Sequence, residues 1–260
     1  MVQTAREAAL TVLERCRRNQ AFSDSLLANV LKESGLDARD RALTTKISYG
    51  VLQNTTLLDF YIDSFCNGAS KLEPKVRDIL RLSLYQILFL DKVPDHAAVS
   101  QAVELCNKTG FSRASGLVNA VLRRILRSKD ALPEIPQENK IRYLSIKLST
   151  PEELVSEFVS DFGFDFTEQL LEANNSIAPL TVQVNTLKTT SEQLIAALAR
   201  EGISATIQEG LENCLSLSST GDLTELETFK AGLFFVQDTA AAMAILAANP
   251  SPAEKVLDAC

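Results

Sequence analysis

Three arginines near the end of one predicted helix have the chemistry to bind phosphate. Arg123, Arg124 and Arg127 lie on one side of the predicted helix 116–127. Its other side carries the apolar residues Leu117, Val118, Val121, Leu122, Ile125 and Leu126. A planar guanidinium can donate two hydrogen bonds to one phosphate group, so three of them together favour a polyanionic partner. Cations near a helix C-terminus also complement the helix dipole, and the sequence leaves both interpretations open.

Cysteine and histidine side chains give no pattern for catalysis or metal binding. The five cysteines are scattered without a Cys-x-x-Cys pair, and His96 is the only histidine. We therefore expect neither a disulfide framework nor a metal site. Cys16, Cys66 and Cys106 occupy helical positions that suit core packing, and Cys214 precedes a short predicted strand. No catalytic residue is assigned in this sequence.

The last six residues, Lys255–Cys260 (KVLDAC), have the pattern of a short buried strand. Pro250 and Pro252 end the preceding helix, and the apolar run then ends in small residues. In open α/β sheets, ligands bind beyond the carboxyl end of such a strand, where a glycine-rich turn leads into a helix. The run is either the first strand of a nucleotide-binding domain or an edge strand of a smaller fold.

Charge is distributed unevenly along the 260 residues. The net charge is −7, but residues 1–130 carry 19 Lys and Arg against 14 Asp and Glu, whereas residues 131–260 carry 7 against 19. Clustered cations bind nucleic acid by releasing its counterions, so the first half is expected to contact a polyanion. Arg6, which lies off the apolar stripe of the first predicted helix, is a further candidate for this contact. Ordinary solvation of both halves is the alternative.

Apolar periodicity divides the chain into an all-α part and an α+β part. Residues 1–130 are predicted to form a bundle of about seven helices with 76–90 at its centre, followed by a linker over 131–145 that contains Pro133 and Pro136. Residues 146–238 are expected to form two helices and a small sheet in the order β-α-β-β-β. Residues 239–260 would then be a helix and the start of a truncated Rossmann-type domain. With 46% hydrophobic residues and no signal-peptide or membrane-spanning run, we expect a cytoplasmic protein that contacts no membrane.

Several segments resemble one known family. Leu80–Val99 (LRLSLYQILFLDKVPDHAAV) and Gly116–Arg127 (GLVNAVLRRILR) resemble the N-terminal domain of the bacterial Sun/RsmB ribosomal RNA cytosine-5 methyltransferases. That domain is similar to the helical RNA-binding protein NusB. The resemblance continues through Pro179–Lys188 (PLTVQVNTLK), Gly232–Asp238 (GLFFVQD) and Lys255–Cys260, and so covers nearly the whole chain.

The resemblance implies transfer of a methyl group from S-adenosylmethionine to carbon 5 of a cytosine in small-subunit ribosomal RNA. It assigns Asp258 and Cys260 to the start of the cofactor site, and it makes RNA the expected polyanionic partner of Arg123, Arg124, Arg127 and Arg6. The nucleophilic cysteines of the family lie in Thr-Cys and Pro-Cys contexts, which this sequence lacks. We therefore expect these 260 residues alone neither to bind the cofactor tightly nor to methylate RNA, and to be monomeric.

The resemblance also implies a NusB-like domain and a subdomain similar to an RNA-recognition motif. Residues 180–236 lack the aromatic-rich stacking signature of such motifs, which favours packing over RNA contact for their sheet. Asp238 precedes a predicted helix and is expected to cap it. Two alternatives remain open, namely a stand-alone NusB-like RNA-binding factor without catalysis and a protein-interaction scaffold.

Overall fold

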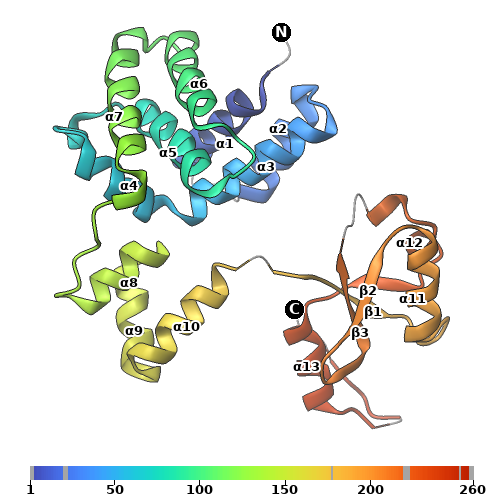
Figure 1. The fold of residues 1–260 in the computed structure, drawn as a ribbon. Helices are drawn as coiled ribbons and strands as arrows, with labels where there is room; N and C mark the ends of the chain where they lie inside the picture. Colours follow the sequence, from blue (N-terminus) through green and yellow to red (C-terminus); the bar gives the residue numbers. More distant parts are fainter. Residues whose placement is uncertain (1–2, 20–22, 177, 219–222, 252, 258–260) are drawn as a thin grey trace. The chain divides into compact units, whose positions relative to one another are not determined.

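Within the residues that the structure describes, seven α-helices form the first part of the protein, as the periodicity predicted. The computed structural model describes residues 3–19, 23–176, 178–218, 223–251 and 253–257 (Figure 1). The helices of this bundle are α1 (Ala5–Asn19), α2 (Ser23–Ser34), α3 (Ala38–Gln53), α4 (Thr55–Phe65), α5 (Pro74–Phe89), α6 (Asp95–Lys108) and α7 (Ser115–Arg127).

Helix α5 is the centre of this bundle. Proline at its first position has the backbone angle that starts a helix, and Ile79, Leu80 and Leu84 are fully buried. It packs against α1, α3, α4, α6 and α7. Its contact with α3 is close, since a Cβ added at Gly50 would clash with the ring of Tyr85. The predicted central helix is thus confirmed.

Three further helices follow the bundle, and the first of them lies partly where the sequence predicted a linker. They are α8 (Lys140–Leu148), α9 (Glu152–Phe162) and α10 (Phe164–Asn174). The predicted linker 131–145 therefore ends too late. Its prolines do leave 132–139 without helix, but Asn139 then accepts a hydrogen bond from the amide of Arg142 and starts α8.

Helices α8–α10 belong to the same compact unit as the bundle. Their own core is formed by Leu144, Leu148, Val155 and Leu171. The amide of Leu57 in α4 donates to Oγ of Ser149, and Nε2 of Gln53 donates to the carbonyl of Asn175. The compact units are residues 1–175, here the bundle unit, and residues 176–260, here the sheet unit. The boundary lies about where the first strand begins and not at the proline-rich segment.

The described residues of the sheet unit form four antiparallel strands. They are β1 (Leu180–Val184), β2 (Ser204–Gln208), β3 (Leu211–Ser218) and β4 (Phe234–Val236), in the spatial order β2-β3-β1-β4. Helices α11 (Ser191–Arg200) and α12 (Glu227–Lys230) lie on one side of this sheet (Figure 1). Val182, Val184 and Leu215 form a core there with Leu194 and Leu198. The predicted small α+β subdomain is confirmed.

Helix α13 (Thr239–Ala248) follows β4 and contacts β3. Asp238 caps it as predicted, because its side chain accepts a hydrogen bond from the amide of Ala240 at 2.7 Å. The predicted strand 255–260 is not formed over 255–257, since these residues pair with none of the four strands, and Val256 and Leu257 are exposed. Residues 258–260 lie outside the described part of the chain. None of the described helices is long and apolar enough to cross a membrane.

Candidate nucleic-acid interface

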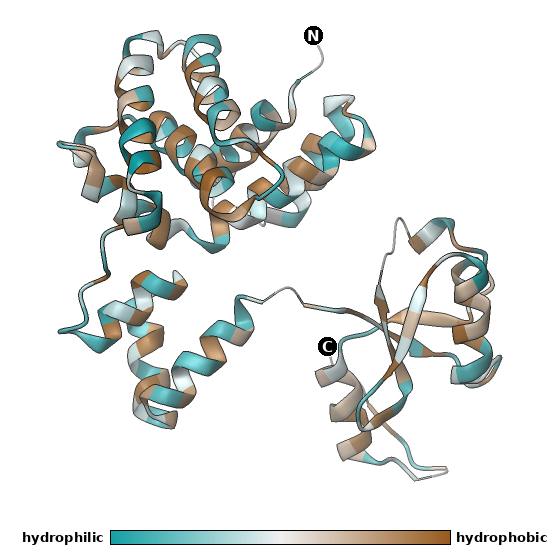
Figure 2. Ribbon diagram, in the orientation of Figure 1, coloured by the Kyte–Doolittle hydropathy of each residue, from teal (hydrophilic) through white to brown (hydrophobic). Residues whose placement is uncertain are grey.

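Helix α7 presents its three arginines because its opposite side is fixed in the bundle core. Val118, Val121, Leu122 and Ile125 are buried. At 3.6 residues per turn, Arg127 lies about 40° from Arg123 and about 60° from Arg124 around the helix axis. All three side chains are exposed, and the part of α7 that carries them is hydrophilic in Figure 2. We call Arg123, Arg124 and Arg127 the arginine surface.

Each arginine of this surface has a different local contact. Nε of Arg123 donates to Oδ1 of Asn119, one turn earlier, at 2.9 Å. The guanidinium of Arg124 lies 5.8 Å from the ring centre of Phe65 in α4, whose carbonyl accepts a weak hydrogen bond from it at 3.5 Å. Arg127 bonds no residue of the described chain. These contacts orient two guanidiniums and leave donors free on all three.

No described carboxylate neutralises the arginine surface. Within the described residues, none of its three guanidiniums lies within 4.0 Å of an Asp or Glu oxygen. Arg81 of the same bundle differs, because it bridges Asp59 and Asp78, at 2.6 and 2.9 Å. Arg81 thus joins α5 to α4, whereas the arginines on α7 keep their charge available for an external anion.

A groove beside the arginine surface adds polar groups that the sequence did not assign. A cavity of about 620 Å³ between α6 and α7 is lined by His96, Ser100, Asn119 and Arg123, among others. His96 and Ser100 are four residues apart on α6, and both are exposed. That spacing in the sequence predicts that His96 and Ser100 share one side of α6. Only the packing of α6 on α7 places the two side chains near Arg123. Lys129, at the same end, is instead held by Asp95 at 3.1 Å.

Arg6 does not belong to the arginine surface. It lies on α1, where its Nε donates to Oε1 of the buried Gln86 at 2.7 Å. Burial lowers the pKa of Arg6, and Asp40 partly opposes that shift. The prediction grouped it with the exposed arginines because it lies off the apolar stripe of α1, but that side of the helix faces α5.

The cysteine positions agree with packing. Cys66, Cys106 and Cys214 are buried, and Cys16 is partly buried. Burial raises the pKa of all four thiols, which disfavours the nucleophilic thiolate. Asp258 and Cys260, the residues assigned to the cofactor, lie outside the described residues. No group of three potential metal ligands occurs in the part that the structure describes.

Two family models match the chain, and they match its two kinds of architecture. The NusB family matches residues 3–127, which end with α7. The ferredoxin-like domain of the RsmF/B-like methyltransferases matches residues 150–224, which extend from just before α9 through β3.

Curated relatives match nearly the whole chain. A probable ribosomal RNA small subunit methyltransferase B of Bacillus subtilis is 34% identical over 258 residues, which are 99% of this chain and 57% of the relative. A protein of the same name from Synechocystis is 32% identical over 259 residues, 99% of this chain and 58% of the relative. The chain thus spans less than three-fifths of the length of these relatives.

A solved structure shows the same fold. The crystal structure of PH0851 has a TM-score of 0.64 and 20% sequence identity, over 98% of this chain and 57% of that one. The chain therefore contains a NusB-family domain followed by an RsmF/B-like ferredoxin-like domain, and it is consistent with the N-terminal portion of the proteins named ribosomal RNA small subunit methyltransferase B.

Proposed function

We propose that the bundle binds ribosomal RNA through the arginine surface. The observation that carries this proposal is that Arg123, Arg124 and Arg127 are exposed on one side of one helix with no described carboxylate to neutralise them. An exposed, unpaired guanidinium binds phosphate more favourably than a paired one, because no internal ion pair has to break first. The adjoining groove, with His96, Ser100 and Asn119, supplies further hydrogen-bonding groups for an RNA strand.

The protein of which this chain is a portion is proposed to methylate carbon 5 of a cytosine in small-subunit ribosomal RNA. The names of the relatives support the methyl transfer and the RNA, and the family resemblance supplies the cytosine and the donor, S-adenosylmethionine. The buried cysteines described above offer no nucleophile, so the role proposed for these 260 residues is to bind and position RNA. A stand-alone RNA-binding factor would use the same surface without the chemistry.

RNA binding is tested by replacing Arg123, Arg124 and Arg127 together with alanine. Each lost phosphate contact should reduce the slope of log affinity against log salt by about 1, so the triple variant should lose roughly 2 to 3 units of slope. Affinity for a small-subunit ribosomal RNA fragment, measured by fluorescence anisotropy at several salt concentrations, gives both quantities.

The matched control removes the same charge from another exposed part of the bundle. Arg39, Arg41 and Lys46 on α3 are exposed and form no ion pair with the described residues. Their triple alanine variant should retain the wild-type salt slope. Equal slopes for the wild type and the α7 variant would show that RNA, if bound, contacts another surface.

Methylation is tested in cells that express the protein. Deleting its gene should remove one 5-methylcytosine from small-subunit ribosomal RNA, which bisulfite sequencing detects as a newly converted cytosine. A second strain carrying the α7 triple variant should show reduced methylation at the same position. An unchanged bisulfite pattern in the deletion strain would contradict the proposed activity and leave the RNA-binding factor as the better description.

A further inference from the structure

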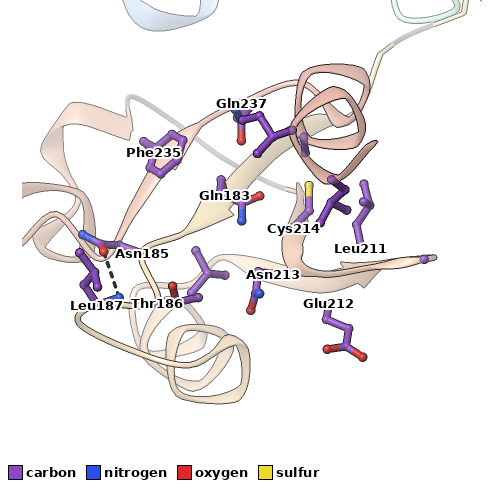
Figure 3. A pocket seen from close by; sticks show the side chains of 15 residues that line it. Gln183, Asn185, Thr186, Leu187, Leu211, Glu212, Asn213, Cys214, Phe235 and Gln237 are labelled. Atoms are coloured by element: carbon purple, nitrogen blue, oxygen red, sulfur yellow. Dashed lines mark hydrogen bonds between the residues drawn. The ribbon is translucent and has the colours of Figure 1, made fainter. Parts of the chain in front are cut away.

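The sheet unit has a large hollow on the side of the sheet that α11 and α12 do not cover. Its volume is about 610 Å³, and it is lined by residues of β1, β3 and β4 and by α13 (Figure 3). Leu211, Ile245 and Leu246 form apolar parts of its wall. Ile245 and Leu246 are 56% and 61% exposed.

A row of side chains across three strands forms the floor of the hollow. Gln183 on β1 is directly opposite Phe235 on β4 and Cys214 on β3. Cross-strand partners project from the same side of a sheet, so the three side chains are neighbours. Figure 3 shows Gln183 between the other two. Phe235 is 48% exposed, and an exposed aromatic ring can stack on a planar ligand.

Two side-chain amides at this floor are free to bind a ligand. The amides of Gln183 and Gln237 bond no side chain or backbone group of the described residues, and both residues are partly buried. Asn185 differs, because its amide donates to the carbonyl of Gly232 and accepts from the amide of Leu187. Each free amide has two donors and an acceptor, which can pair with the donors and acceptors on the edge of a nucleobase.

The charges around the hollow exclude phosphate as the recognised group. Among its lining residues, Glu212 is the one with a carboxylate, and none is a lysine or arginine. A phosphate would be repelled by Glu212 and would gain no counter-charge. A neutral, planar ligand with hydrogen-bonding edges fits the aromatic ring, the amides and the apolar wall together.

We propose that this hollow binds one unstacked nucleobase of RNA, with its ring on Phe235 and its edge on the amides of Gln183 and Gln237. This proposal rests on the proposed function in one respect, namely that the natural ligand is RNA. The expectation from sequence was packing without RNA contact, because the sheet lacks an aromatic-rich signature. A single ring with two amides is too sparse for that signature but sufficient for one base.

The proposal is tested with cytidine as a probe, titrated into the whole 260-residue chain and followed by NMR. Stacking of a base on an aromatic ring contributes about 1–3 kcal/mol, so Phe235→Ala should weaken cytidine binding by about fivefold or more. Gln183→Leu, which keeps the size of the side chain but removes its amide, should also weaken binding. Cytidine 5′-monophosphate should bind no better than cytidine, and ribose 5-phosphate should not bind.

The matched control is Phe166→Ala, which removes a ring that is 54% exposed in the bundle unit. It should leave cytidine binding unchanged, and circular dichroism should show all variants folded. No binding of cytidine to the wild type, or equal binding by wild type, Phe235→Ala and Gln183→Leu, would overturn the proposal.

The α7 triple variant separates this proposal from the preceding one. Cytidine has no phosphate, so its binding should be unaffected by loss of Arg123, Arg124 and Arg127. If the triple variant binds RNA normally but Phe235→Ala loses cytidine, only the arginine-surface proposal fails. If the triple variant loses affinity for RNA, but the wild type, Phe235→Ala and Gln183→Leu all bind cytidine equally, only the nucleobase proposal fails.

Discussion

Individual charged residues in the bundle differ in whether their partner lies inside or outside the protein. Glu14 on α1 forms an ion pair with Nζ of Lys75 and another with the guanidinium of Arg18, both at 2.9 Å. The pKa of Glu14 is lowered by the hydrogen bond from Lys75 and by the positive charges of Lys75, Arg18 and Arg17. Partial burial of the carboxyl opposes this shift. These cations therefore have a structural partner, unlike the arginines of α7.

Replacing Glu14 with glutamine should make the bundle less stable in a pH-dependent way. A carboxyl whose pKa is lower in the folded state stabilises the fold above its ordinary value of 4.5, and this contribution is lost as pH falls through the lowered pKa. The variant should lose about 0.5–1 kcal/mol of unfolding free energy near neutral pH and almost nothing at about pH 3. Urea denaturation at both pH values measures the difference.

The matched control for this substitution is Glu152→Gln. Glu152 is exposed at the start of α9 and forms no ion pair with the described residues. It should change stability little at either pH. A pH-independent loss for Glu14→Gln would mean that its contacts act through packing and not through charge.

At the scale of elements, helices α8–α10 determine where the first unit ends. Leu144 of α8 is fully buried, and α8 packs on α4 of the bundle. Leu198 of α11 is fully buried in the core of the sheet unit. The two leucines thus report on different cores.

Alanine substitutions at these leucines should therefore affect two different unfolding transitions. Each should cost about 2–5 kcal/mol through lost burial and a cavity. In calorimetry, Leu144→Ala should shift the same transition as Ile79→Ala in the centre of the bundle, whereas Leu198→Ala should shift the other. If Leu144→Ala shifts the transition affected by Leu198→Ala, α8 belongs energetically with the sheet unit.

Most helices and strands could be predicted from the sequence because their signals are local. The apolar stripe of α7 and the alternation in β1 each depend on a few consecutive residues. The start of α8 was missed because two nearby prolines suggested a longer loop than Asn139 allows. Arg6 was misplaced because periodicity shows which side of a helix is apolar but not which polar residue a neighbouring helix covers.

The candidate sites depend on information that the sequence holds only indirectly. The arginine surface lies within one helix and was predicted, although its RNA contact stays a proposal. The groove with His96 depends on how α6 packs against α7, and the hollow depends on the register of three strands. No local pattern connects residues 183, 214 and 235, so these features needed the folded structure.

At the scale of the whole molecule, the division of charge does not follow the division into units. The excess of cations is confined to residues 1–130, while residues 131–175, within the same unit, carry 3 Lys and Arg against 9 Asp and Glu. Residues 176–260 carry 4 against 10. By net charge, a polyanion is attracted to residues 1–130 and repelled by residues 131–260, which agrees with the proposal that the sheet recognises a base and not a phosphate.

The alternation of β1 makes the hollow dependent on the opposite side of the sheet. Val182 and Val184 point into the core while Gln183 between them points out, and a shift of one residue in the pairing would exchange the two sets. Such a shift would bury the amide of Gln183 and expose Val182 and Val184, and each change would destabilise the sheet unit. Burial of the two valines thus determines which side of the sheet each residue of β1 faces. An insertion or deletion in β1 would therefore remove the amide of Gln183 from the floor of the hollow, even if every residue around the hollow were kept.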